Sequence, residues 1–383
     1  MKILVNTIST KKISGGAFQI AQNFLLKSLE HKEIEWYYIT SYDVDEVIGK
    51  RFDDIRNKRY FVFPTQPDFG RTYEKVKKQV HKLEDGIKPN VVYTVTAPSY
   101  FSFKTTEVMR FTNPWVAHPN KYSWSVLSLK EKLRTYLYCL NQKRLMRSAH
   151  YFITQAETTK QGIMRITHEE SSHVAVVSNV LPAAFKMMDN TPITDDKWIN
   201  IAAVGAPVPH KNFDIIPKVL SALKQKGINN VRFHTTIPFG HPLAKAIKTM
   251  LEKDNLLENW VNHGRVSQTE LGDMYRRCQF AFLPTLLEVF SASIVEAMYF
   301  NLPVVATKFN FNTEVLEDSC LYYEPKNAQD AACQIETLIK DKKLQNVCKK
   351  KMQEELAKYG DYDVHFNAIK DFLIDVANKN ILL

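Results

Sequence analysis

The chain has 383 residues, of which 45% are hydrophobic and 24% are charged, and its formal net charge is +10. This composition excludes a disordered, collagen-like or coiled-coil chain, and the length predicts about two domains. No apolar run approaches the ~18 residues of a membrane span. The first residues predict a strand and not a signal peptide, so we expect a cytoplasmic protein.

The positive charge is concentrated in the first half of the chain. Residues 1–200 contain 29 Lys and Arg against 20 Asp and Glu, and residues 104–147 contain nine basic side chains against Glu107 and Glu131. A one-sided basic surface favours an anionic partner: a phospholipid surface, a lipid phosphate or nucleic acid. A surface that serves only solubility explains the same charge equally well.

In the first half, apolar strands alternate with amphipathic helices. Strands are predicted at 2–6, 36–40, 60–63, 90–96, 108–111, 151–154 and 173–177. Helices are predicted after the Ser14-Gly15-Gly16 loop, at 73–83, and from Ser128, whose spacing to Glu131 is typical of a capping box. This last helix carries Leu133, Leu137 and Leu140 on one stripe.

The pattern restarts after a polar linker near residues 195–197. Strands are predicted at 199–204, 231–237, 260–263, 280–283, 303–307 and 321–323, with helices that include 213–226, 269–278 and 290–300. The last part of the chain is predicted to be helical, with a break near Gly360-Asp361. Strands that alternate with helices indicate parallel sheets in an α/β fold.

We therefore expect two Rossmann-like domains with parallel sheets that face a central cleft. The first domain would span residues 1–195 and the second residues 196–360. Residues 361–383 are expected to form a helix that packs back on the first domain. Five scattered cysteines without a C-x-x-C pair indicate free thiols and no structural metal site; they are Cys139, Cys278, Cys320, Cys333 and Cys348.

The most informative segment, residues 283–308, contains two glutamates, Glu288 and Glu296, that are separated by seven residues. Glu288 is predicted in a strand-to-helix loop and Glu296 about two turns into the helix, so both can face one crevice. Loop N–H groups at 289–292 suit a diphosphate, and a carboxylate further along suits ribose hydroxyls. By spacing alone, a surface helix with two solvated glutamates is the simpler interpretation.

Three other loops follow predicted strands, where open α/β sheets bind ligands. Lys211 follows the strand that ends at Gly205 and can neutralise phosphate oxygens. Gly264 allows a close backbone approach, and the N–H groups of Gly15-Gly16 could meet a phosphate or sugar. Taken singly, each has a simpler interpretation: Lys211 as an exposed loop lysine, Gly264 as part of a plain turn, and Gly15-Gly16 as a glycine pair that is weak evidence for a binding site.

Together and in this order, the four features resemble the retaining glycosyltransferases of the GT-B fold, family GT4 (glycosyl transferases group 1). The resemblance is strongest over residues 199–325. The family's motifs are matched by Glu288–Glu296 (E-x7-E), Lys211-Asn212 (phosphate-binding K-N), His263-Gly264-Arg265-Val266 (G-x-V loop) and Gly15-Gly16 (glycine loop). The stretch 144–154 is similar to the family's R-x-A-D strand entry, with His150 in place of the usual Asp.

The resemblance implies that the first domain binds the acceptor and the second the nucleotide-sugar donor, and it implies roles for these residues. Glu296 would hold the ribose, Glu288 would contact the transferred sugar and Lys211 would hold the diphosphate. His118 occupies the approximate place of an acceptor-side histidine, although a core histidine is an equally good interpretation. The expected catalytic residues are Glu288, His118 and Lys211, and the expected nucleotide-sugar site comprises Gly15, Gly16, Gly205, Lys211, Arg265, Val266, Glu288, Val289, Phe290, Ser291 and Glu296.

The implied activity is that of a hexosyltransferase in surface polysaccharide synthesis. It would move a hexose-type sugar, with retention of configuration, from a UDP- or GDP-sugar to a glycan or lipid-linked glycan. No cofactor or metal is expected to be obligatory, and the D-x-D at residues 43–45 is interpreted as surface. Nucleic acid is not expected as a partner, whereas the basic first half fits peripheral contact with an anionic membrane at the inner membrane face.

One departure from the family keeps alternatives open. The family often has an arginine directly after the glycine of the first loop of its second domain, and this chain has Ala206 there. His210 or Arg265 could supply the second charge. The alternatives are a GT-B nucleotide-sugar epimerase, which would consume donor without an acceptor, a basic nucleic-acid-binding protein, and a degenerate transferase that binds nucleotide without turnover.

Overall fold

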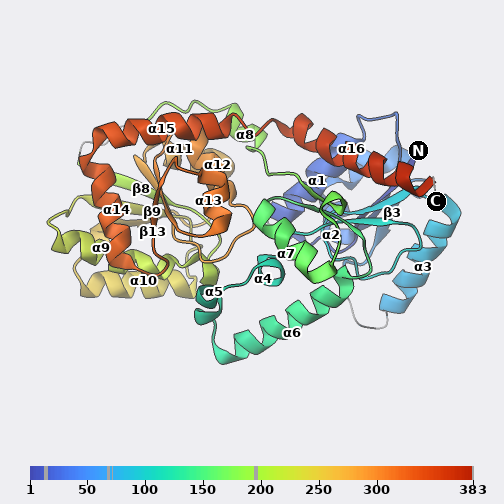
Figure 1. Ribbon diagram of the computed structural model, residues 1–383, viewed down its shortest axis with the longest axis horizontal. Coiled ribbons are helices and arrows are strands. Elements are labelled where there is room, and N and C mark those ends of the chain that lie inside the picture. The colour runs from blue at the N-terminus through green and yellow to red at the C-terminus, as the bar shows by residue number, and fades with distance from the viewer. Residues whose placement is uncertain (13–15, 67–69, 71, 194–196, 382–383) are drawn as a thin grey trace. The chain divides into compact units, whose positions relative to one another are not determined.

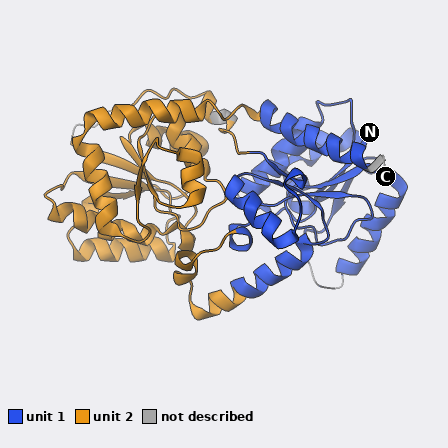
Figure 2. Ribbon diagram, viewed as in Figure 1, with its two compact units in different colours: residues 1–117, 135–177, 363–383 blue, residues 118–134, 178–362 orange. Residues whose placement is uncertain are grey.

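The computed structural model of the chain describes residues 1–12, 16–66, 70, 72–193 and 197–381 (Figure 1). The chain forms two compact units (Figure 2). Unit 1 consists of residues 1–117, 135–177 and 363–383, and unit 2 of residues 118–134 and 178–362. Most of the linker predicted near 195–197 lies outside the described residues.

Unit 1 contains a seven-stranded parallel sheet with the order β3-β2-β1-β4-β5-β6-β7. Its strand β1, third in this order, is a short apolar run in which Ile3, Leu4 and Val5 are wholly buried, as expected where helices cover both faces of a parallel sheet. Its strands are β1 (Lys2–Thr7), β2 (Glu35–Ser41), β3 (Tyr60–Phe63), β4 (Val91–Thr94), β5 (Glu107–Arg110), β6 (Tyr151–Thr154) and β7 (Val174–Val176).

The helices of unit 1 include one from the far end of the sequence, α16, which packs on α1. The Phe366 ring of α16 lies 5.0 Å from that of Phe24 and 4.7 Å from that of His31, and Lys27 pairs with Asp363 at 2.7 Å. The helices are α1 (Gly16–Ser28), α2 (Tyr42–Ile48), η2 (Gly49–Ile55), α3 (Thr72–Ile87), α4 (Pro114–Ala117), α7 (Glu157–Thr167), η3 (Ser171–His173) and α16 (Tyr362–Ile381), and α6 (Leu129–Met146) belongs to both units.

Unit 2 contains a six-stranded parallel sheet with the order β10-β9-β8-β11-β12-β13. Its strands are β8 (Ile199–Ala203), β9 (Val231–Thr235), β10 (Trp260–Asn262), β11 (Phe280–Leu283), β12 (Val304–Thr307) and β13 (Leu321–Tyr323). Its helices are α5 (Lys121–Ser125), α8 (Ala183–Lys186), η4 (Pro209–Lys211), η5 (Phe213–Ile215), α9 (Ile216–Gln225), α10 (Pro242–Lys253), η6 (Leu257–Asn259), α11 (Gln268–Arg276), α12 (Ala292–Tyr299), α13 (Asn310–Leu316), α14 (Ala328–Lys340) and α15 (Lys342–Leu356).

In both sheets the first strand is third in the order. The chain adds the next two strands on one side of it, out to the edge, and then adds the remaining strands on its other side. In unit 2 the reversal falls between β8 and β11, which are paired in parallel with Phe280 opposite Ile201. A ligand site is expected at the carboxyl ends of the two strands that flank such a reversal. The prediction of two Rossmann-like domains with parallel sheets is confirmed, and the fold directs attention to the loops after β8 and β11.

The D-x-D of residues 43–45 lies in helix α2, where its two carboxylates have different partners. Asp43 accepts the backbone N–H of Lys12 at 2.8 Å, and Asp45 pairs with Arg56 at 2.8 Å. Both side chains are half-buried, so the segment is less exposed than the surface stretch predicted from the sequence. Within the described part of the chain, no helix has the length and apolar character needed to cross a membrane.

Candidate active site

The loops that follow β8 and β11 are fastened to each other by backbone and amide groups. The N–H of Leu286 donates to the carbonyl of His210 at 2.7 Å, and the Asn212 amide donates to the carbonyl of Pro284 at 3.2 Å. Asn212 has a φ of +57°, a left-handed conformation that Asn tolerates better than most residues. These bonds fix Lys211, which lies between His210 and Asn212, against the loop that carries Glu288.

Lys211 and Glu288 form an ion pair. Their side chains are only 15% and 20% exposed, so the pair is partly shielded from solvent and its electrostatic energy exceeds that of a fully exposed pair. The lysine stem lies across Gly205, where an added Cβ would stand 3.5 Å from the Lys211 Cδ and 3.2 Å from the Phe213 ring. The small residue after β8 therefore leaves room for this lysine.

Glu296 lies in the second turn of α12 and is 7% exposed. The Tyr275 hydroxyl, on α11, donates a hydrogen bond to its Oε2 at 2.7 Å. Burial raises the pKa of Glu296, while the Tyr275 hydrogen bond and the Lys211 charge act in the opposite direction. Lys211 thus interacts with both carboxylates, one by direct pairing and the other through its charge.

The second positive charge expected beside Lys211 is not supplied by His210. Burial, with the neighbouring Lys211 charge adding to it, lowers the pKa of His210 to about 4, although Glu288 opposes the shift. The imidazole is therefore neutral at pH 7. Arg265 and Ala206 are both exposed, so Arg265 is the remaining cation of the two that the sequence offered.

The residues before α12 contribute backbone rather than side chains. Val289 and Phe290 are 3% and 5% exposed, and the Phe290 ring packs edge-on against Tyr359 at 5.6 Å. Helix α12 begins at Ala292, two residues later than predicted, and its N-cap Ser291 makes no side-chain capping bond in the described structure. The N–H of Ile294 donates to the carbonyl of Ser291 at 3.0 Å, and the N-terminus of α12 has the polarity that favours an anion.

The loop after β10 contains Gly264 in a left-handed conformation, with a φ of +72°. A Cβ at this position would stand 2.4 Å from the Phe239 ring, which covers the glycine and is itself 76% exposed. Val266 is half-buried. The close approach that the sequence predicted at Gly264 is made by an aromatic side chain of the same unit.

His118 is the first residue of the segment 118–134, which belongs to unit 2. Its ring stacks on Phe311 of α13 at 6.2 Å, and the nearby Asn120 amide donates to the carbonyl of Leu286 at 2.8 Å. The loop that carries Glu288 is thereby held on two sides, by the loop after β8 and by Asn120. Of the glycine loop, Gly15 lies outside the described residues, and Gly16 is the exposed first residue of α1 in unit 1.

Three contributors were not predicted from the sequence. Tyr275 precedes Glu296 by 21 residues and resembles any buried helix residue. Phe239 lies in a loop far from Gly264 along the chain, and Asn120 contacts Leu286 across 166 residues. The one available signal was the capping pattern of Asn120, whose side chain accepts the N–H groups of Tyr122 and Ser123, and that pattern predicts a helix start rather than a site.

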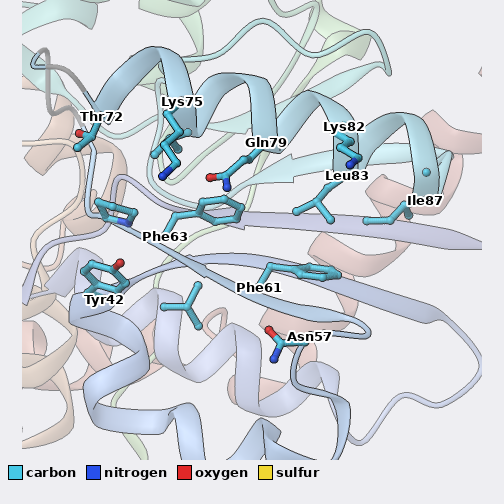
Figure 3. A pocket seen from close by; sticks show the side chains of 14 residues that line it. Tyr42, Asn57, Phe61, Phe63, Thr72, Lys75, Gln79, Lys82, Leu83 and Ile87 are labelled. Atoms are coloured by element: carbon cyan, nitrogen blue, oxygen red, sulfur yellow. The ribbon is translucent and has the colours of Figure 1, made fainter.

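A cavity of about 760 Å³ lies away from this site, in unit 1 between β3 and α3 (Figure 3). Lys75 and Gln79 extend from α3 toward Phe63 of β3 (Figure 3). The described residues that line it include Lys75 and Lys82 but no carboxylate or histidine. Its described lining mixes apolar and polar side chains with two lysines and offers no carboxylate to pair with them, so the pairing of carboxylate and lysine in unit 2 remains the candidate for chemistry.

The two parallel sheets define the fold of the chain as a GT-B fold. Solved structures of this class are similar to almost the whole chain. HepE from Anabaena has a TM-score of 0.70 at 16% identity, covering 98% of this chain and 100% of that one. The lipopolysaccharide outer core galactosyltransferase WaaB has a TM-score of 0.68 at 13% identity, covering 98% and 99%. At these identities the likeness shows the fold.

Residues 186–355 match the model of the family Glycosyl transferases group 1. The chain is 26% identical to the O-antigen chain mannosyltransferase RfbU of Salmonella typhimurium over 51% of its own length and 54% of that protein. It is 31% identical to an uncharacterized glycosyltransferase of Methanocaldococcus jannaschii over 37% and 38%. The chain thus spans about half or less of these curated relatives, and the resemblance to group 1 GT-B enzymes is confirmed.

Proposed function

We propose that the protein is a retaining glycosyltransferase that moves a hexose-type sugar from a UDP- or GDP-sugar to a glycan or lipid-linked glycan, in surface polysaccharide synthesis. One observation carries this proposal: Lys211 interacts with both Glu288 and Glu296 at the carboxyl ends of β8 and β11. Relatives support it, since HepE was crystallised with UDP and with UDP-glucose, and RfbU is named a mannosyltransferase.

The proposed chemistry follows from charge. Breaking the bond between sugar C1 and the diphosphate makes the ring oxocarbenium-like and leaves negative charge on the diphosphate. Lys211 and the first N–H groups of α12 would stabilise the diphosphate. Glu288 would face the transferred sugar and stabilise its positive charge, and the leaving phosphate would accept the proton of the acceptor hydroxyl during attack on the same face. No metal is required by this scheme.

Glu296 would bind the ribose. Its Oε2 accepts the Tyr275 hydroxyl, so a ribose hydroxyl would donate to Oε1. A hydrogen bond to a charged group contributes about 1.5–3 kcal/mol, and burial at 7% exposure keeps water from competing for it. This role predicts that removing the Glu296 carboxylate weakens nucleotide binding.

The test is thermal unfolding of the full chain with UDP, GDP, ADP, CMP and dTDP. Nucleotide at ten times its Kd adds about 1.4 kcal/mol of stability. We expect one nucleotide to raise the Tm of the wild type, little effect on Glu296→Ala, and a full effect on the matched control Glu354→Ala, whose side chain is 61% exposed on α15. Full transfer activity in Glu296→Ala would overturn the site assignment.

Turnover separates the proposal from its rivals. The nucleotide sugar that matches the stabilising base is incubated with and without glycan acceptors, and released nucleotide is measured. Release that depends on acceptor supports transfer, whereas conversion of the donor sugar without acceptor indicates epimerisation. A nucleotide binder without turnover is the second candidate, because Ala206 and the neutral His210 leave few cations beside Lys211; it predicts a Tm shift and no release.

A further inference from the structure

Helix α6 (Leu129–Met146) has two apolar stripes, and only one of them faces the protein. The inward stripe contains Cys139, Gln142 and Met146, which are buried. Cys139 and Met146 belong to a core cluster that includes Met109 and Phe152 of the sheet in unit 1. This stripe anchors the helix, so the other apolar stripe is not needed to hold α6 in place.

The outward stripe contains four leucines, and their spacing of four, four and three residues places them on one face of the helix. Leu129 is 85% exposed, Leu133 62%, Leu137 56% and Leu140 45%. Tyr136 lies on the same face and is 54% exposed. Contiguous apolar surface of this kind is uncommon on soluble proteins and marks a surface that meets a partner.

Basic side chains surround the exposed leucines. Helix α6 contains five Lys and Arg, Arg147 follows directly, and Glu131 is its one acid. The Glu131 carboxylate is already engaged at the helix start, where it accepts the Ser128 N–H at 2.8 Å and the Ser128 hydroxyl at 2.7 Å. The cations are Lys130, Lys132, Arg134, Lys143, Arg144 and Arg147.

We propose that the outward face of α6 docks on the surface of a bilayer that contains anionic phospholipid. Leucines with flanking Lys and Arg are the composition by which an amphipathic helix lies in a membrane interface, with apolar side chains at the acyl boundary and cations at the phosphates. Charge complementarity selects this occupant over a second copy of the chain. Two copies joined through α6 would bring their like charges together, which opposes association.

Membrane docking is a property beyond the proposed transfer reaction, and it is measured without donor or acceptor. Full-length protein is sedimented with vesicles of phosphatidylcholine alone and with vesicles that also contain phosphatidylglycerol. Two variants test the apolar and the charged part of the α6 surface separately. The leucine variant, Leu133→Gln with Leu137→Gln, removes apolar contacts. The charge variant, Lys130→Gln with Lys132→Gln and Arg134→Gln, removes three positive charges. The controls lie on α15, which also exposes apolar and basic side chains: Val347→Gln, and Lys342→Gln with Lys343→Gln and Lys350→Gln.

We expect the wild type to bind phosphatidylglycerol vesicles at low salt and phosphatidylcholine vesicles weakly. The leucine variant should lose at least tenfold in binding at any salt concentration, and the charge variant about fivefold per cation at low salt. The α15 controls should bind like the wild type. Unchanged Tm and an unchanged nucleotide-induced Tm shift in each variant show that the fold and the donor site are intact.

Three results would overturn the proposal. The wild type could remain in the supernatant with phosphatidylglycerol vesicles, or the α15 variants could lose as much binding as the α6 variants. Gel filtration could also show an oligomer that Leu133→Gln with Leu137→Gln dissociates, which would assign the face to self-association. Because vesicle binding and nucleotide-induced stabilisation are separate measurements, failure of the docking proposal leaves the proposed transfer activity standing, and the converse also holds.

Discussion

The ammonium of Lys211 pairs with the carboxylate of Glu288, although the two residues are 77 positions apart in the chain. They meet because β8 and β11 are adjacent parallel strands, so the loops at their carboxyl ends leave the sheet at one place. In the proposed function, the donor diphosphate would compete with Glu288 for this ammonium. Because of this competition, replacing Glu288 should strengthen nucleotide binding and slow sugar transfer.

Glu288→Gln should therefore bind UDP or GDP more tightly than the wild type while transferring sugar more slowly. Freeing Lys211 from a partly shielded ion pair is expected to lower the nucleotide Kd about fivefold, equivalent to ~1 kcal/mol. Loss of the negative charge near the sugar should reduce kcat about a hundredfold. Calorimetric titration and product release measure the two quantities, with Glu354→Gln as the control, and a variant with wild-type kcat would exclude Glu288 from the chemistry.

Tyr275→Phe should destabilise the protein more at high pH than at low pH. The phenyl ring can keep its stacking on Phe300, at 5.2 Å, but the hydrogen bond to Glu296 is lost. That bond lowers the pKa of Glu296, so removing it raises the pKa further. A raised carboxyl pKa costs stability as pH rises through it.

Urea unfolding at pH 5 and pH 8 tests this sign. The expected loss is about 1–3 kcal/mol at pH 8, where a buried carboxylate lacks a donor, and less at pH 5. Tyr136→Phe, on an exposed face of α6, is the control that should unfold like the wild type. An equal loss at both pH values would contradict the coupling between Tyr275 and the charge of Glu296.

Glu107→Gln should change the pH dependence of unit 1. Glu107 is buried at the start of β5, where the Thr94 hydroxyl and the Ser99 hydroxyl, the latter at 3.1 Å, donate to it. Burial raises its pKa to about 7, against an ordinary value of 4.5. The carboxyl therefore destabilises the fold progressively as pH rises from about 4.5 to 7, by an amount on the order of 3 kcal/mol.

The glutamine variant does not titrate, so its stability relative to the wild type should increase over that interval and level off above it. Denaturant unfolding at several pH values measures the difference. Glu74→Gln, an exposed substitution on α3, should leave the pH profile unchanged. A constant difference between Glu107→Gln and the wild type from pH 4.5 to 8 would show that Glu107 does not titrate in this range.

Gly264→Ala should destabilise unit 2 through two separate effects. The residue has a φ of +72°, which costs an L-residue about 1 kcal/mol, and the new Cβ would lie 2.4 Å from the Phe239 ring. Adding Phe239→Ala removes the second effect but not the first. Thermal unfolding should therefore show partial rescue in the double variant, and full rescue would mean that the backbone is not strained.

The regular elements of this fold could be predicted where an apolar run has clear limits. Residues 280–283 and 321–323 are strands at the predicted positions, because polar residues or turns border each run. The meeting of Lys211 with Glu288 was also within reach, since carboxyl ends of adjacent parallel strands share one edge of a sheet. The sequence predicts that the two loops lie close together, but it does not predict that the Lys211 and Glu288 side chains form an ion pair.

Other features have no local pattern that could reveal them. Periodicity finds that Leu133, Leu137 and Leu140 share a stripe of α6, but it does not say whether that stripe or the one with Cys139 and Met146 faces the core. The burial of Cys139 and Met146 decides it, through contacts with strands distant in the sequence. The hydrogen bond between Tyr275 and Glu296 has no local pattern either, because it depends on the tertiary contact of α11 with α12.

Helix α16 determines the order in which the chain can finish folding. Unit 1 begins with β1 but includes residues 363–383, and the Phe366 ring covers Phe24 and His31. On the ribosome, every residue of unit 2 is synthesised before this helix is. Unit 2 can therefore reach its native state before unit 1, although most of unit 2 follows unit 1 in the sequence. Until α16 is synthesised, the apolar surface around Phe24 that Phe366 covers in the folded chain stays open to water.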